Sequence, residues 1–143
     1  IMILLGIKIM TELDKVISAA YASEGKQEDV NKVYLALLKS SLFLPVQKEQ
    51  RTDSDEPFHP LYAVFDKNCF MLAFDTLDRL THWAKDQIDN ITYVEISGRD
   101  LIAGINPDVF LVLNLETDYH KEFSPDEIRH LKKIVSKIDQ LKN

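Results

Sequence analysis

The feature that most constrains the fold of this chain is a pair of strand-like runs that are apolar on both faces. The first, PLYAVFDKNCFMLAF, spans residues 60–74, and the second, VFLVLNL, spans residues 109–115. Successive side chains of a strand point to opposite faces of a sheet, so a strand without a polar face needs cover on both sides. Helices or a partner chain have to provide that cover.

Turn residues divide the first run into a hairpin. Asp66-Lys67-Asn68 separates its two apolar halves, and Asp and Asn accept turn conformations readily. Shorter strands are predicted over 41–46, with Pro45 at a sheet edge or a strand end, and over 91–97. The run at 109–115 is expected to lie in the centre of the sheet.

Apolar residues recur at helical spacing in the segments between these strands, over residues 11–21, 30–38, 76–86 and 124–141. Thr11 is the expected N-cap of the first helix, with Asp14 at the reciprocal position. Ser124 and Glu127 form the corresponding capping box of the last helix, and Pro125 occupies its first position. A short helix or turn is expected over 98–105.

The resulting order, α-α-β-β-β-α-β-α-β-α, predicts a single α+β domain. We expect a mixed sheet of roughly five strands, an N-terminal helical hairpin and a long C-terminal helix. Residues 10–143 are expected to form the domain, and residues 1–9 an N-terminal extension or arm. That apolar arm resembles a signal-peptide core, but no basic cluster precedes it, and the charged residues Glu12, Asp14 and Lys15 come soon after it.

Charge and composition exclude several function classes. The formal net charge of -6 argues against nucleic-acid binding, which needs a basic face. No apolar run approaches the roughly 20 residues of a membrane span. The single cysteine, Cys69, precludes an intramolecular disulfide and suits a cytoplasmic location.

No cofactor, metal or catalytic constellation is predicted. Four glycines cannot build a phosphate-binding loop, and the four histidines lack zinc spacing. Gly98-Arg99-Asp100 stands at a strand-to-helix junction where an anion can dock, but a simple turn is the favoured interpretation. Cys69 has no expected base beside it and is interpreted as a structural thiol.

Three segments are candidates for a ligand pocket. The polar stretch at 47–58 is long enough to form a binding loop. The ETDYH segment carries Asp118 and His120, and the turn containing Asn106 lies before the last apolar strand. Asn106, Asp118 and His120 are therefore the candidate ligand-binding residues. In the same turn, Gly104 and Pro107 are expected to determine the fold by ending a helix and preventing its continuation, as Ser124 and Pro125 do by starting one.

Several segments together resemble the N-terminal domain of the SseB family, bacterial proteins named for an enhanced-serine-sensitivity phenotype. The similar segments are ALLKSSLFLPV (36–46), residues 60–85, GRDLIAGI (98–105), INPDVFLVLN (105–114) and FSPDEIRHL (123–131). The resemblance implies neither an enzyme class nor catalytic residues. Longer members of the family carry a second, C-terminal domain.

These observations favour a non-enzymatic module that acts through protein contacts. The expected contact surfaces are the 47–58 loop and a sheet edge, and a homodimer is expected to form through a sheet edge or residues 1–9. One alternative is a small-ligand-binding protein or enzyme, with its pocket between the 47–58 loop, the Asn106-Pro107 turn and the His120 loop. Another is a secreted effector or translocon-associated component.

Overall fold

The computed structural model describes residues 10–47 and 60–142 of the chain. The arm expected at residues 1–9 and nearly all of the 47–58 loop lie outside these ranges. The elements follow the order α1 (Glu12–Ala22), α2 (Gln27–Lys39), β1 (Ser41–Gln47), β2 (Tyr62–Phe65), β3 (Asn68–Ala73), α3 (Leu77–Ala84), the 3-10 helix η2 (Lys85–Asn90), β4 (Ile91–Ser97), α4 (Gly98–Gly104), β5 (Phe110–Leu113), β6 (Lys121–Phe123) and α5 (Pro125–Leu141).

The strands form two sheets. The larger has four strands in the order β2-β3-β5-β6, and the smaller pairs β1 with β4. β3 and β5 run parallel, whereas the other neighbouring strands are antiparallel. Two isolated bridges, Phe43 with Phe74 and Val46 with Pro60, connect the sheets. The α+β class and the mixed sheet are confirmed, with the strands divided between two sheets.

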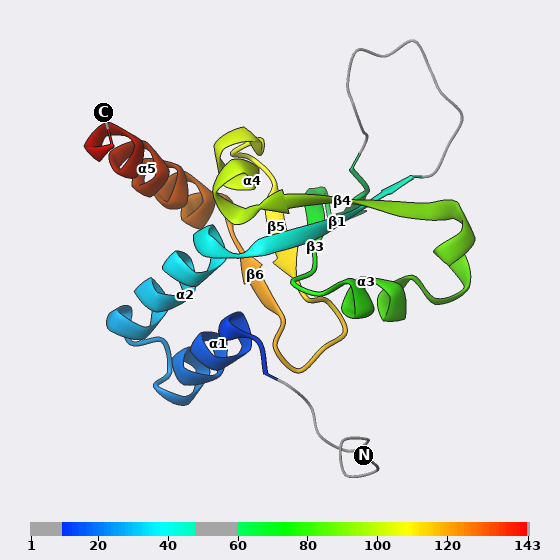
Figure 1. Ribbon diagram of the computed structural model, residues 1–143, viewed down its shortest axis with the longest axis horizontal. Helices are drawn as coiled ribbons and strands as arrows, with labels where there is room; N and C mark the ends of the chain where they lie inside the picture. Colours follow the sequence, from blue (N-terminus) through cyan, green and yellow to red (C-terminus); the bar gives the residue numbers. More distant parts are fainter. Residues whose placement is uncertain (1–9, 48–59, 143) are drawn as a thin grey trace.

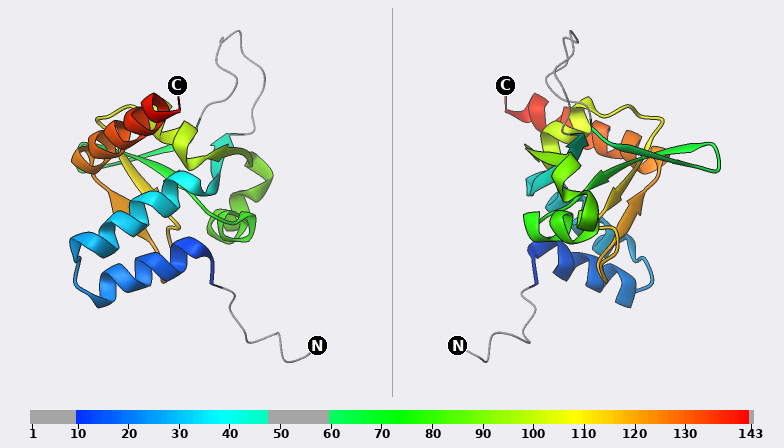
Figure 2. Two further views of the ribbon diagram at one scale, coloured as in Figure 1. Left: turned by 60° about the vertical axis from the view of Figure 1, so that its left-hand side comes forward. Right: turned by 90° about the vertical axis from the view of Figure 1, so that its right-hand side faces the viewer.

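Helices cover both faces of the larger sheet at β5 and the second half of β3 (Figures 1 and 2). On one face, Ala73, Leu111 and Leu113 belong to a core shared with α1, α2, α4 and α5. On the other, Leu72 and Val112 pack with α3. Both faces of β5 are therefore buried, as its two-sided apolar sequence predicts, and each buried aliphatic side chain contributes roughly 1.5–3 kcal/mol.

Helix caps appear where the sequence places them. Thr11 accepts a hydrogen bond from the backbone N–H of Asp14, whose carboxylate accepts one in return from the Thr11 backbone. Ser124 and Glu127 form the same reciprocal pair at α5, with Pro125 as the first helical residue. No helix in the described ranges is both long and apolar enough to cross a membrane.

α4 begins and ends with a glycine, and the two glycines have different roles. A Cβ added to Gly98 would lie 1.8 Å from the backbone oxygen of Leu37, so α2 and α4 approach too closely there for any side chain. α4 ends at Gly104, where an added Cβ would meet nothing within 4 Å. Pro107 then lies in the turn before β5, closed by a hydrogen bond from the Val109 N–H to the Asn106 carbonyl.

Two segments differ from the sequence-based expectation. β6 occupies residues for which no strand was predicted, because pairing with β5 stabilises a three-residue strand in which only Phe123 is buried. β2 has the expected strand conformation, but every one of its residues is exposed. Its apolar side chains are thus not covered by the helices that bury β3 and β5.

Candidate functional site

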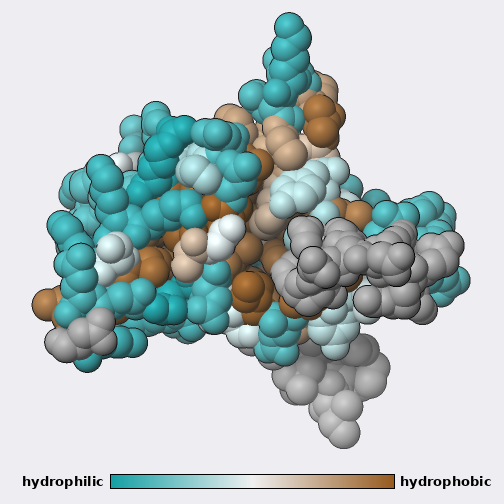
Figure 3. All heavy atoms as spheres, turned by 90° about the horizontal axis from the view of Figure 1, so that it is seen from above, coloured by the Kyte–Doolittle hydropathy of each residue, from teal (hydrophilic) through white to brown (hydrophobic). Residues whose placement is uncertain are grey.

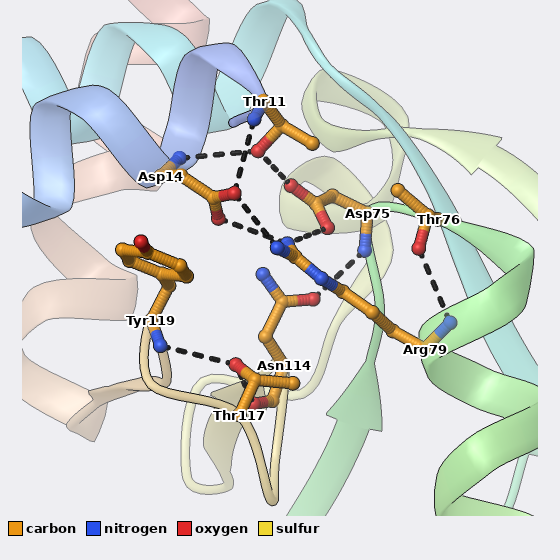
Figure 4. Close-up of polar contacts among 8 residues, drawn as sticks. All are labelled: Thr11, Asp14, Asp75, Thr76, Arg79, Asn114, Thr117 and Tyr119. Atoms are coloured by element: carbon orange, nitrogen blue, oxygen red, sulfur yellow. Dashed lines mark hydrogen bonds and ion pairs between the residues drawn. The ribbon is translucent and has the colours of Figure 1, made fainter. Parts of the chain in front are cut away.

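A charged cluster lies where α1, the end of β3 and the start of α3 meet (Figure 4). The Arg79 guanidinium donates hydrogen bonds to both carboxylate oxygens of Asp14, at 2.9 and 2.7 Å, and to Asp75 at 2.7 Å. The Asp14 side chain is fully buried, and those of Asp75 and Arg79 are only 4% and 18% exposed. Two carboxylates and one guanidinium leave the cluster with a net charge of -1.

Local capping requirements position each member of this cluster. Asp14 is the third residue of α1 and forms the capping box of this helix with Thr11. The Thr11 hydroxyl also donates a hydrogen bond to the Asp75 carboxylate at 2.5 Å. Thr76 caps α3 by accepting a hydrogen bond from the Arg79 backbone N–H. The caps of two helices thus face each other, and Arg79 lies between their acidic residues.

The cluster holds Asp14 in its ionised form. Burial alone would raise the pKa of Asp14, but hydrogen bonds from Arg79 and from the Thr11 backbone, together with the Arg79 charge, lower it below the ordinary value. The same Asp14 contact raises the pKa of Arg79. Asp14 and Arg79 therefore both stay charged across the physiological range and form a fixed ion pair.

Asn114 lies beneath the cluster and has an unusual conformation. It directly follows β5, is fully buried and has a φ of 57°, in the left-handed region. Its side-chain oxygen accepts a hydrogen bond from the Asp75 backbone N–H at 3.0 Å. Its side-chain nitrogen has no hydrogen-bond partner among the described residues. Figure 4 places this amide between Arg79 and Tyr119, whose ring centroid lies 5.7 Å from the guanidinium carbon.

A cleft of about 590 Å³ opens over the cluster. Partly buried Arg79, Thr117 and Tyr119 contribute to its lining, and exposed acidic side chains lie around them: Asp78, Glu116 and Asp118. Within the described residues, no group of three or more His, Cys, Asp or Glu side chains is arranged to hold a metal ion. The cleft therefore presents an acidic rim over a guanidinium that is already engaged by two carboxylates.

His120 belongs to a different cleft, of about 480 Å³, between the α1–α2 hairpin and β6. Its carbonyl accepts a hydrogen bond from the Tyr21 hydroxyl at 2.8 Å. Ile17 and Val33 contribute apolar lining, and Lys121 and Glu127, 3.1 Å apart, contribute charged lining. This cleft has a mostly aliphatic interior with one ion pair.

Tyr34 makes a related polar contact near the base of α5. Its hydroxyl donates to the Glu127 carboxylate at 2.7 Å. Burial, reinforced by the adjacent Glu127 carboxylate, raises the pKa of Tyr34. Tyr34 thus remains a neutral hydrogen-bond donor that fixes the capping residue of α5 against α2.

The structure does not gather the three predicted ligand residues into one pocket. Asn106 precedes β5, where its side chain accepts a hydrogen bond from the Asp108 N–H at 2.8 Å. Asp118 and His120 come after β5, at the opposite end of the strand, and line separate clefts. Arg99, which belongs to the Gly98-Arg99-Asp100 segment where an anion could dock, forms ion pairs with Asp100 and Asp139.

The β2–β3 hairpin carries several exposed apolar side chains. It projects from the body of the molecule, as the right-hand view in Figure 2 shows. Val64 and Phe65 are each 74% exposed, and Tyr62 is 48% exposed. In Figure 3 the projection, at the top of the view, carries hydrophobic surface below a hydrophilic tip.

The hairpin ends in a two-residue turn of defined geometry. Asp66 and Lys67 have φ values of 53° and 68°, and positive φ at both central positions is the signature of a type I′ turn. Among the described residues, β2 pairs with β3 alone and is the first strand in the order of the larger sheet. The turn keeps β2 in register with β3.

Comparison with known proteins identifies the family. The family description "SseB protein N-terminal domain" matches residues 13–130. Comparison with curated proteins and with solved structures gave no significant match. The matched segment covers α1 through the first turns of α5, and with them both sheets and the charged cluster. The chain therefore belongs to the SseB family, through its N-terminal domain.

Proposed function

We propose that this domain is a protein-interaction module whose contact element is β2 on the projecting hairpin. The observation that carries the proposal is the exposure of Val64 and Phe65, both 74%, on adjacent positions of an edge strand. Adjacent strand residues point to opposite faces, so both faces of β2 present apolar side chains to solvent.

Edge strands of soluble proteins ordinarily carry protection against pairing with other chains. Charged side chains, proline, bulges or a covering loop provide it. The β2 sequence YAVF contains no charge and no proline, and its four residues pair with β3 without a bulge. Such a strand is suited to pair with a strand of another chain, the recognition mode known as β-augmentation.

The geometry of the charged cluster supports an interaction module over an enzyme. Arg79 directs its hydrogen bonds to Asp14 and Asp75, so the strongest cation of the cleft binds the protein itself. Its effect is to hold α1 against the start of α3. Arg79 is therefore occupied by carboxylates of the protein itself.

Site-specific photo-crosslinking in the native cells tests this proposal. Replacing Phe65 by p-benzoylphenylalanine places a photoreactive aromatic group on β2, and the added benzoyl group can be accommodated because Phe65 is 74% exposed. Leu141, which is 87% exposed at the end of α5, provides a matched control position. A discrete protein adduct at position 65 that is missing at position 141 is expected. Equal, non-specific labelling at both positions would refute β2 as a contact element.

A second candidate function is the binding of a small ligand in the cleft over the cluster. The polar lining of this cleft favours it, since Arg79, Thr117 and Tyr119 bring hydrogen-bonding groups together in a concave site. A thermal-shift screen of small acceptor-bearing metabolites tests this candidate, because a ligand at 100 times its Kd adds roughly 2.7 kcal/mol. The Tyr119→Ala variant should lose such a shift, because Tyr119 lines the cleft, and a shift that persists in this variant would place the ligand elsewhere.

A further inference from the structure

We propose that the partner of β2 is β2 of a second copy of the chain. Two copies would pair these strands antiparallel about a two-fold axis and join their four-stranded sheets into one sheet of eight strands. This inference rests on the proposed function, since it names the partner of the same strand.

The hairpin turn determines which backbone groups face outward. In a β-turn, the carbonyl of the first residue accepts from the N–H of the fourth, so the Phe65 carbonyl is directed toward Asn68. Hydrogen-bonded and non-hydrogen-bonded pairs alternate along an antiparallel ladder. The N–H and C=O groups of Val64 therefore turn away from β3, toward the outer edge. Among Ala63, Val64 and Phe65, it is Val64 that can form hydrogen bonds with a second strand.

The side chains of β2 allow two copies of this strand to pair about Val64 without a steric clash or repulsion between like charges. Val64 would lie opposite Val64 of the second copy and exchange two hydrogen bonds with it. On either side, the small Ala63 would face the large Phe65 of the second copy. No charged residue of β2 meets a like charge, because β2 has none. The same strand thus supplies both halves of an apolar interface.

Charge at the hairpin tip also permits a second copy to approach. Asp66 and Lys67 offset each other at the turn, although the whole chain carries a net charge of -6. The hairpin projects from the body, so the two bodies would lie on opposite sides of the shared strands. Repulsion between them is weakened by salt, whose screening length is about 8 Å at physiological ionic strength.

The surroundings of β2 favour a second copy over a separate peptide. Peptides that add a strand to a sheet gain specificity from side-chain pockets beside the edge. Val64 and Phe65 are each 74% exposed, so β2 itself offers apolar side chains to another strand. Pairing of identical strands needs no such pocket, because each copy supplies the side chains that cover the other.

The size of the contact predicts its strength. β2 has four residues, whereas a standard interface uses about 20–30 residues a side. The dimer is therefore expected to be weak and concentration-dependent, with a dissociation constant above about 1 µM.

Sedimentation velocity on the full chain tests the dimer. The wild-type chain should shift from monomer toward dimer as its concentration rises from roughly 1 to 500 µM, the range expected for a weak contact. Val64→Lys should remain monomeric, because an edge lysine blocks strand pairing, and its melting temperature should be unchanged because Val64 is exposed. Leu141→Lys, the matched control, should dimerise like the wild type. Monomeric wild type throughout the range, or dimerisation of Val64→Lys, would overturn the inference.

Disulfide trapping tests the register independently. In a Cys69→Ala background, Val64→Cys should form a disulfide-linked dimer readily, because paired Cα atoms about 5.5 Å apart suit a disulfide. Phe65→Cys would face Ala63 and should link more slowly, at a rate nearer that of a Leu141→Cys control. Equal rates at all three positions would contradict the pairing centred on Val64.

The two proposals fail in different ways. If photo-crosslinking at position 65 yields an adduct only with a different protein, the second copy is refuted and the interaction module stands. If position 65 gives no specific adduct at all, both are refuted.

Discussion

Arg79 donates two hydrogen bonds to the carboxylate of Asp14, a residue 65 positions earlier in the chain. This contact joins the first turn of α1 to the first turn of α3, and Asp75 adds a third hydrogen bond from the end of β3. Since the Asp14 carboxylate is fully buried, its charge depends on Arg79 for compensation. The cluster thus holds together α1, the end of β3 and α3, although α1 is distant from the other two in the sequence.

Replacing Arg79 by methionine should destabilise the fold strongly. The variant keeps most of the side-chain volume but leaves two buried carboxylates without a cation, at a cost of about 3 kcal/mol. Urea unfolding measures this cost. Arg129→Met is the matched control, because Arg129 is 49% exposed and pairs only with exposed carboxylates, so it should change stability by less than about 1 kcal/mol. Equal losses of stability in Arg79→Met and Arg129→Met would show that the Arg79 contacts do not hold α1 and α3 together.

Stability should fall in acid because of Asp14. Its folded-state pKa lies below the ordinary value of 3.8, so below that pH the unfolded state binds the proton first. The contribution of Asp14 is present above pH 3.8 and is lost as the pH falls through the folded-state pKa. Unfolding free energies between about pH 5 and pH 2 should decline less steeply in Asp14→Asn than in the wild type. If the free energies of unfolding of the two proteins declined in parallel with pH, protonation of Asp14 would not contribute to acid unfolding.

Asn114→Asp should destabilise the fold by about 2 kcal/mol at neutral pH. The aspartate retains an oxygen for the Asp75 N–H, so the main change is a further buried negative charge near Asp14 and Asp75. Protonation removes that charge. The loss of stability relative to the wild type should therefore shrink as the pH is lowered toward about 4, near the ordinary pKa of an aspartate. A deficit that is constant with pH would instead indicate a steric or conformational cause.

The two glycines of α4 should respond oppositely to alanine. Gly98→Ala forces a Cβ against the Leu37 backbone and should cost about 3 kcal/mol or more. Gly104→Ala has open space at a helical position and should change stability by less than about 1 kcal/mol, in the stabilising direction. Thermal unfolding of both variants checks the pair. A well-tolerated Gly98→Ala would mean that α2 and α4 can separate at low cost.

Local sequence rules predicted much of this fold. The caps at Thr11 and Ser124 follow from side chains three residues apart, and the burial of β5 follows from its two apolar faces. β6 escaped prediction because its pairing with β5 depends on a neighbour and not on its own alternation.

The site was less predictable for the same reason. Asp14 was identified as a capping residue, but nothing near it in the sequence indicates that Arg79 will reach its carboxylate. The left-handed conformation of Asn114 is accessible to asparagine, yet its position in the sequence is typical of a strand end. The composition of β2 is typical of a buried strand, and only the arrangement of the helices shows that it is left exposed.

Residue-resolved hydrogen exchange of the Val64 amide tests the central claim most directly. If β2 pairs with another strand, the Val64 N–H enters a hydrogen bond, and its exchange should slow as the chain is concentrated or the partner is added. The Lys67 amide in the hairpin turn, outside the paired region, should not change. Exchange at Val64 that stays as fast as at Lys67 at every concentration and with every partner would contradict the assignment of β2 as the contact strand.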